Sequence, residues 1–307
     1  MIPRSAAIAL SIVWSLQGVP APQPPATFRA ETRLVVLHAT VKNTRGVEVT
    51  DLDERAFRVY ENGKRQTITL FRRDDIPVSL GLVIDNSGSM RALRGRVEAA
   101  ALAFVRASNP LDEVFVLNFA DKPRVDVPLT SDMRRLEAGI ARVDSIGGTA
   151  LRDAIDMAET YLGQHAARDR RVLLVITDGR DNASTATLRE IQRVSEQTDT
   201  AVYAIGVFSD PESPNAKEGR REIDRLTGQT GGAAYYPTTA DGVDAIVDEL
   251  ARQIRNQYTM AYAPTNQALD GSYRRIRVEA RGRESLLVRT RAGYVAAPPN
   301  ETRAIRN

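Results

Sequence analysis

The chain has 307 residues, of which 42% are hydrophobic and 26% charged, and its formal net charge is +3. This composition is close to the globular average and excludes a fibrous or disordered chain. The small net charge, without a dense basic cluster, excludes a nucleic-acid partner. There is no cysteine, so disulfides, thiol catalysis and cysteine-based zinc sites are excluded as well. The length favours one main domain accompanied by one or two small ones.

Residues 1–24 have the form of a secretory signal peptide. Arg4 precedes an apolar run from Ala6 to Trp14, and a polar, proline-rich stretch follows. The run is far shorter than the ~20 residues that span a bilayer, so we expect export, with an uncleaved anchor as the alternative. No later segment could span a membrane. We therefore predict a secreted or periplasmic protein.

Residues 25–75 form a predicted β module. A β-like run, RLVVLHATVKN, ends at a turn at Thr44-Arg45-Gly46, and FRVYENGKRQTITLF follows. In the second segment, Asn62-Gly63 separates two alternating runs, which is a strong hairpin signal.

From Val78 onward the pattern changes to apolar strands that alternate with helices. The strand-like runs are VSLGLVI, EVFVLNFA, RVLLVIT and AVYAIGVF, and residues 124–129 add a predicted antiparallel edge strand. Strands that are apolar on both faces imply a mostly parallel sheet with helices on both sides, which is the doubly wound, Rossmann-like α/β fold. Apolar residues at helical spacing predict helices at 92–107, 132–143, 150–164, 188–197, 219–227 and 242–257.

After Gln257 the chain returns to a β pattern with YTMAYAP, YRRIRVEA and SLLVRTRAGYVA. Each β flank is too small to be stable alone, since a lone hairpin is marginal in water. We therefore expect residues 258–307 to pack with residues 25–75 as a small β-sandwich, with the α/β domain of residues 76–257 inserted between them.

Three polar loops follow the predicted strands of the α/β domain. Asp85-Asn86-Ser87-Gly88-Ser89 comes directly after VSLGLVI, Gly147-Gly148-Thr149 precedes a helix, and Thr177-Asp178-Gly179 follows RVLLVI. Ligands of open α/β sheets bind at the carboxyl ends of the strands, so the three loops can converge there. Each fragment alone is an ordinary helix cap or loop. It is their conjunction in this order that predicts a binding site.

Convergence would gather three hydroxyls and two carboxylates, from Ser87, Ser89, Thr149, Asp85 and Asp178. These hard oxygen donors suit Mg²⁺ or Mn²⁺, with Ca²⁺ as a further option. If the hydroxyls face the ion while the aspartates act through water, the ion keeps much of its positive charge. It would then attract a carboxylate from outside, so the site predicts recognition of an Asp or Glu side chain on a partner protein.

These residues resemble the complete metal-ion-dependent adhesion site of von Willebrand factor type A domains. The resemblance covers about residues 76–257. It implies that Ser87, Ser89 and Thr149 contact the ion, directly or through water, while Asp85 and Asp178 hold coordinated waters or bind alternately. The flanking motifs FRVYENGKRQ, YTMAYAP and RAGY resemble the secreted group called VWFA-related in Acidobacteria. The family implies a non-catalytic binding protein without identifying its partner.

Three other functional classes fit the sequence less well. A Mg²⁺-dependent phosphatase of the haloacid dehalogenase type needs D-x-D, and Ser87 stands at the second position. A serine hydrolase needs a nucleophile with a base, yet there is no G-x-S-x-G and only His38 and His165 are available. A structural envelope scaffold with a vestigial site remains as the other alternative. The Asn182-Ala183-Ser184 sequon is interpreted as chance, and the polar segment 209–220 as a mobile surface loop that could contribute to the rim of the site.

Overall fold

The computed structural model describes residues 33–73, 75–142, 146–238, 240–282 and 284–297. The predicted signal peptide and the tail from Pro298 lie outside the described residues. No helix within the described ranges is both long and apolar enough to cross a membrane.

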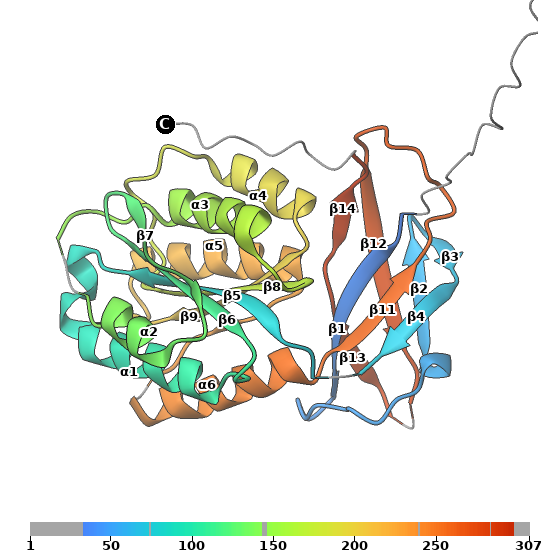
Figure 1. Ribbon diagram of the computed structural model, residues 1–307, viewed down its shortest axis with the longest axis horizontal. Helices are drawn as coiled ribbons and strands as arrows, with labels where there is room; N and C mark the ends of the chain where they lie inside the picture. Colours follow the sequence, from blue (N-terminus) through green and yellow to red (C-terminus); the bar gives the residue numbers. More distant parts are fainter. Residues whose placement is uncertain (1–32, 74, 143–145, 239, 283, 298–307) are drawn as a thin grey trace, which may run out of the picture. The chain divides into compact units, whose positions relative to one another are not determined.

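The α/β domain is built on a six-stranded sheet with the strand order β10-β9-β8-β5-β6-β7 (Figure 1). All neighbours pair in parallel except β7, which runs antiparallel to β6 and confirms the predicted edge strand. The strands are β5 (Val78–Asp85), β6 (Glu113–Phe119), β7 (Pro123–Thr130), β8 (Arg170–Thr177), β9 (Thr200–Gly206) and β10 (Ala234–Tyr235).

Helices cover both faces of this sheet, and each face has its own apolar core. Alternate residues of β5 point to opposite faces of the sheet. Leu82 belongs to the core with Phe104 and Leu250, and Val83 belongs to the core on the other face, with Ile155. This double coverage explains why the strands are nearly all apolar, and it confirms the predicted doubly wound fold class. The helices are α1 (Arg94–Ala107), α2 (Met133–Ile140), α3 (Leu151–His165), α4 (Leu188–Gln197), α5 (Pro214–Thr230) and α6 (Ala240–Arg255).

One local prediction was wrong, and another differs from the structure only at its boundary. The segment 209–220 is not all loop, because α5 already begins at Pro214, where the Ser213 side chain caps the helix by accepting the Ala216 N–H and proline occupies the first turn. The helix expected from residue 92 begins at Arg94 and is preceded by a 3₁₀ helix, η2 (Gly88–Leu93). The apolar spacing of η2 resembles that of an α-helix, so the sequence pattern does not distinguish the 3₁₀ helix from the α-helix that follows it.

The β flanks on either side of the α/β domain contribute strands to two shared four-stranded sheets, ordered β13-β1-β11-β4 and β14-β12-β2-β3. One apolar core lies between them and joins Leu37 and Val59 from the first flank with Met260 and Tyr294 from the second. The predicted β-sandwich is therefore part of the observed fold, while the exact segment boundaries stay predictions. The strands are β1 (Val35–Asn43), β2 (Phe57–Glu61), β3 (Lys64–Gln66), β4 (Ile68–Arg72), β11 (Tyr258–Tyr262), β12 (Tyr273–Ala280), β13 (Leu286–Arg289) and β14 (Gly293–Val295), with a short 3₁₀ helix η1 (Glu54–Ala56) before β2.

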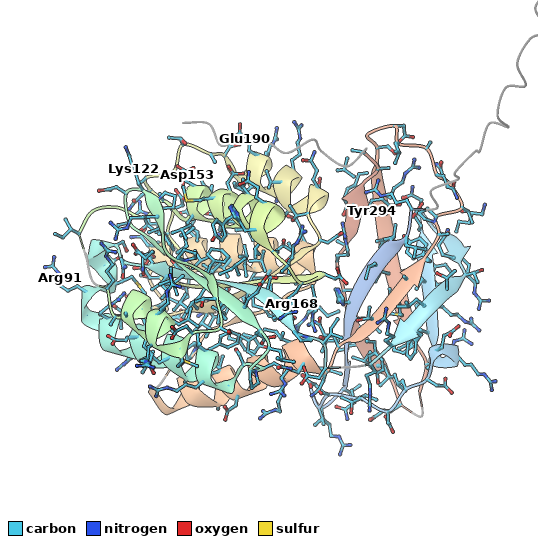
Figure 2. All side chains as sticks on the ribbon, viewed as in Figure 1. Arg91, Lys122, Asp153, Arg168, Glu190 and Tyr294 are labelled. Carbon is cyan, nitrogen blue, oxygen red and sulfur yellow. The ribbon has the colours of Figure 1, made fainter. Side chains whose placement is uncertain are left out.

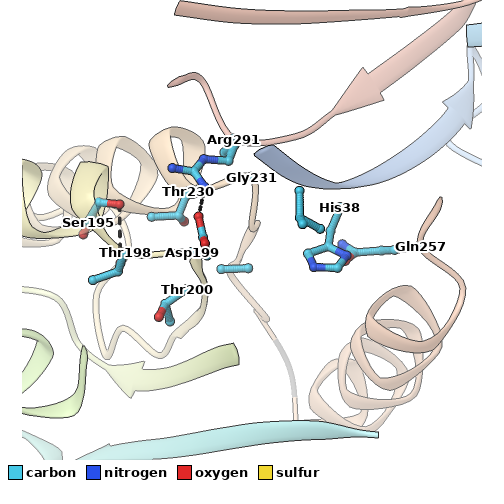
Figure 3. A pocket seen from close by; sticks show the side chains of 11 residues that line it. His38, Ser195, Thr198, Asp199, Thr200, Thr230, Gly231, Gln257 and Arg291 are labelled. Carbon is cyan, nitrogen blue, oxygen red and sulfur yellow. Dashed lines mark hydrogen bonds and ion pairs between the residues drawn. The ribbon is translucent and has the colours of Figure 1, made fainter. Parts of the chain in front are cut away.

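A buried polar network joins the amino end of the α/β sheet to the sandwich. The Arg170 guanidinium donates to the side-chain oxygen of Gln257, whose amide donates to Tyr203 (2.7 Å) and Thr40 (3.1 Å). Figure 3 shows His38 beside Gln257 in this joint. Because the sandwich covers the amino ends of the strands, their carboxyl ends are the edge at which a ligand can approach.

Candidate functional site at the carboxyl ends of the strands

The first polar loop begins inside the core, at the last residue of β5. Asp85 is fully buried and its carboxylate accepts two hydrogen bonds, from the Ser87 N–H (2.8 Å) and the Thr177 hydroxyl (2.6 Å). The Ser87 and Ser89 hydroxyls lie 3.0 Å apart. The loop therefore fixes one carboxylate and two hydroxyls before η2 leads the chain away.

The second loop lies against the first, because the Gly88 N–H donates to the Gly147 carbonyl (3.1 Å). Gly147 has a φ of +99°, which favours glycine, and a Cβ there would collide with the Asp121 carboxylate. That carboxylate in turn accepts the Gly148 N–H (2.6 Å). Thr149 follows, almost completely buried at the start of α3. The tight turn thus brings Thr149 into the loop cluster.

Asn182 holds Thr149 by a reciprocal pair of hydrogen bonds. The Thr149 N–H donates to the Asn182 side-chain oxygen (2.8 Å), and the Asn182 N–H donates to the Thr149 carbonyl (3.0 Å). The sequon residue that the sequence analysis interpreted as chance therefore positions a predicted site residue.

The third loop meets the first through Thr177. Besides donating to Asp85, the Thr177 hydroxyl accepts the Gly179 N–H (2.9 Å). Asp178, between them, is half-buried and close enough for its charge to act on Asp85. Burial raises the pKa of Asp85 to about 6, the charge of Asp178 adds to this increase, and the hydrogen bonds from Thr177 and Ser87 oppose it. Two carboxylates that repel each other in a buried setting form an environment that a bound cation would relieve.

A polar network around Asn86 and Arg94 holds the first loop in place. Asn86 donates to Asn118 (2.9 Å) and accepts from the Arg94 guanidinium, which is buried and also donates to the carbonyls of Ile140 and Arg142. The backbone N–H of Asn86 donates to the Phe119 carbonyl (2.7 Å). These contacts tie the loop to α1, β6 and the end of α2, so its backbone has little freedom to move.

The five predicted site residues thus belong to three loops that contact one another. Asp85, Ser87 and Ser89 share one loop, Thr149 joins it through the Gly88–Gly147 hydrogen bond, and Asp178 joins it beside Asp85. Sequence reasoning did not assign positioning roles to Thr177, Asn182 and Asp121. Only Thr177 lies within a predicted motif; for the other two, no local pattern indicates which distant loop their side chains meet.

The donor set fits a hard divalent cation. It combines hydroxyl and carboxylate oxygens with no nitrogen or sulfur donor. The described residues contain no cluster of three or more His, Cys, Asp or Glu side chains, so a metal here would depend on Ser87, Ser89 and Thr149 as well as on the two aspartates. If the two aspartates act through coordinated water, the oxygens that touch the ion directly are neutral hydroxyls.

Three exposed cationic residues lie close in sequence to the three loops or to Asp121, which contacts the second of them. Arg91 in η2, Lys122 after β6 and Arg180 directly after Gly179 are all exposed. Figure 2 shows Arg91 and Lys122 projecting from the left-hand end of the α/β domain. The exposed Asp121, which accepts the Gly148 N–H, adds a negative charge, so the rim carries charges of both signs.

Comparison with known proteins gives a family match for part of the chain. Residues 80–180 match the von Willebrand factor type A domain family, whereas no curated protein matches. A solved von Willebrand factor type A structure from Catenulispora acidiphila is 13% identical, with a TM-score of 0.50, and the match covers 85% of this chain and 73% of that one. This coverage exceeds the α/β domain, so the likeness in fold extends into the sandwich.

Two further solved structures match a smaller share of the chain. The conserved hypothetical protein BatB from Bacteroides thetaiotaomicron is 20% identical with a TM-score of 0.47, and the match covers 57% of this chain and 98% of that one. The vWF domain of the type V pili tip protein Mfa5 from Porphyromonas gingivalis is 12% identical with a TM-score of 0.47, and the match covers 59% of this chain and 97% of that one. The narrower resemblance to the Acidobacteria group stays a prediction.

Proposed function

Because residues 80–180 match the von Willebrand factor type A domain family, we propose that the protein is an exported, non-catalytic binding module. It holds Mg²⁺, or Mn²⁺ or Ca²⁺, with Asp85, Ser87, Ser89, Thr149 and Asp178, and it captures an Asp or Glu side chain of a partner protein. The bound ion would supply a positive charge with a coordination position for that carboxylate.

The observation that carries this proposal is the arrangement of Asp85 and the two serines. Both oxygens of Asp85 accept hydrogen bonds, from Ser87 and Thr177, so the carboxylate is held in one orientation within the core. The Ser87 and Ser89 hydroxyls, 3.0 Å apart, are neutral donors beside it. A site that relies on neutral donors leaves the charge of its ion available to an outside carboxylate.

The residues around the site support binding over catalysis. Ser87 stands where a Mg²⁺-dependent phosphatase of the haloacid dehalogenase type would need its second aspartate. His38 lies in the joint with the sandwich and His165 is exposed at the end of α3, so neither is near the three loops as a base. The exposed Lys122 and Arg180 would attract an acidic partner surface.

Calorimetric titration with MgCl₂ and MnCl₂ tests the metal site. We expect saturable binding of one ion by the wild-type chain, and a loss in the Asp85→Ala and Ser87→Ala variants at least as large as the ~10–100-fold that supporting residues cost in other metal sites. The double variant should be little worse than either single variant, since both act on one site. Ser108→Ala, at the far end of α1, is the matched control and should bind as the wild type does. Absence of binding to the wild type would refute the proposal.

Export is supported by the signal-like segment at residues 1–24 and by the absence of cysteine from the sequence. Cell fractionation followed by N-terminal sequencing tests it. We expect protein outside the cytoplasm that begins near residues 18–26, and soluble cytoplasmic protein with an intact N-terminus would contradict export.

A further inference from the structure

A cluster of one arginine and two aromatic residues lies beside the third loop, Thr177-Asp178-Gly179. The three loops of the candidate site are called the metal loops below. The Arg220 guanidinium carbon is 4.4 Å from the ring centroid of Tyr236 and 5.6 Å from that of Phe208. The two rings stack on each other with centroids 5.8 Å apart. Stacking against two rings fixes the plane of a guanidinium and leaves its edges available for hydrogen bonds.

The topology of the sheet places this cluster on the same edge as the metal loops. Phe208 comes just after the end of β9 and Tyr236 directly after β10, and both strands run parallel to β8. At that edge the Val207 N–H donates to the carbonyl of Thr177, whose hydroxyl holds Asp85. The cluster is thus linked to the metal loops by one strand pairing.

The helix that carries Arg220 also packs on the third loop. Gly219 packs so closely on Gly179 that a Cβ on Gly219 would lie 2.6 Å from the Gly179 backbone and collide with it. Arg220 follows Gly219, and Asp178 precedes Gly179. The guanidinium and the metal loop therefore belong to neighbouring parts of one surface.

Tyr236 is itself held in place, so the cluster is rigid. Its hydroxyl donates to an Asp224 carboxylate oxygen (2.7 Å) and lies 3.1 Å from the Arg220 carbonyl. Burial raises the pKa of Tyr236, and the hydrogen bond to Asp224 adds to the increase, so the ring keeps its proton at neutral pH. Asp224 is thereby engaged by the tyrosine.

Arg220 has no acidic partner of its own. No ion pair of Arg220 is found among the described residues, and its Nε is buried without a hydrogen-bond acceptor. Because the side chain as a whole is only half-buried, a ligand from outside would meet its Nη atoms. A carboxylate approaching the end of a guanidinium can accept two parallel hydrogen bonds, one from each Nη. This side chain is therefore oriented for an anion that the chain does not supply.

We propose that Arg220, supported by Phe208 and Tyr236, is a second anchor that receives a second carboxylate from the same partner segment. The inference rests on the proposed function: the partner presents one acidic side chain to the metal and another to Arg220. The ligand class is a protein segment with two acidic residues at a defined spacing. Arg220 would then select among acidic partners.

A peptide series tests this anchor on the full chain with Mg²⁺ present. The probes are capped peptides with two glutamates separated by glycine spacers of increasing length, and matched peptides in which the second glutamate is glutamine. We expect one spacing at which the di-acidic peptide binds about tenfold or more tightly than its matched peptide, because the second contact becomes intramolecular. Arg220→Gln should remove this gain and leave binding of the mono-acidic peptide unchanged. Arg225→Gln, an exposed arginine on the same helix, should preserve it.

Several outcomes would overturn the anchor: no spacing gives a gain, the gain survives in Arg220→Gln, or Arg225→Gln removes it equally. Arg220→Lys, which keeps the charge but not the paired hydrogen bonds, should retain only part of the gain, and thermal unfolding shows whether both variants fold. Failure of the proposed function is seen separately, as binding of the mono-acidic peptide that is unchanged in EDTA. In that case the NMR signals of the Arg220 Nη–H groups decide, since the anchor requires them to shift when the di-acidic peptide is added and not when the mono-acidic peptide is added.

Discussion

The two ends of the α/β sheet use similar polar residues for different purposes. At the amino end, beneath the sandwich, Gln257 forms hydrogen bonds with the side chains of Arg170, Tyr203 and Thr40. At the carboxyl end, Asp85 is equally buried, but the loop it anchors leads directly to the exposed Ser89. A covering domain thus turns a polar cluster into a structural joint, while the uncovered edge keeps its polar groups available to a ligand.

If this contrast is correct, the largest effect on stability should come from the joint. Gln257→Leu leaves the buried Arg170 guanidinium and the Tyr203 and Thr40 hydroxyls without their shared partner, so we expect a loss of about 3 kcal/mol or more in the free energy of unfolding. The exposed Gln267 is the matched control, and Gln267→Leu should stay within about 0.5 kcal/mol of the wild type. Denaturant unfolding measures both. Mg²⁺ affinity should not change, and a parallel loss of metal binding would show that the two ends are not independent.

A smaller effect should appear as a pH dependence of the same joint. Burial, together with the charges of Arg170 and Arg291, lowers the pKa of His38 from 6.5 to about 3. Below pH 6.5 the unfolded chain therefore takes up a proton that the folded chain refuses, and stability falls as the pH approaches 3. The wild type should lose about 2 kcal/mol of stability through His38 between about pH 6.5 and pH 4.5. His38→Asn, which keeps an acceptor or donor near Thr259, should not show this loss.

Unfolding midpoints across this pH range check the prediction for His38. The same substitution at the exposed His165 is the matched control. An unchanged acid slope in His38→Asn would mean that the joint admits a charged imidazole.

The smallest effect is expected at the carboxyl end, for the residue that positions Thr149. Asn182→Ala removes the acceptor of the Thr149 N–H, and we expect about a tenfold loss of Mg²⁺ affinity with little change in stability. Asn182→Asp keeps that acceptor and should retain most of the affinity. Calorimetric titration of the two variants separates positioning from general damage, since equal losses in both would contradict the role given to Asn182.

Much of the fold was predictable because both faces of the sheet are buried. Continuous apolar runs such as VSLGLVI give parallel strands, and Asn62-Gly63 gives the hairpin between β2 and β3, with both residues at positive φ. The start of α5 was missed because its signal, Ser213 followed by Pro214, lies in a polar stretch without apolar spacing. The two-residue strand β10 has no period of its own, so it depends on pairing with β9.

The candidate site was predictable only at the residues that recur as a motif. The order D-x-S-x-S, G-G-T and T-D-G identified the three loops and, by resemblance, the five residues. Asn182, Asp121 and Arg220 act through contacts with loops that are distant in sequence, and their local patterns are those of an ordinary sequon, turn and helix. Only the folded arrangement assigns them a partner.

The central claim is that a metal ion in the three loops keeps a coordination position for an acidic side chain. Water-proton relaxation by bound Mn²⁺ tests it most directly, because the relaxation depends on water molecules attached to the ion. We predict enhanced relaxation with the wild-type chain, a decrease when a capped glutamate peptide is added, no decrease with the glutamine peptide, and no enhancement with Asp85→Ala. A wild-type chain that gives no enhancement, or an enhancement that saturating glutamate peptide leaves unchanged, would contradict the account.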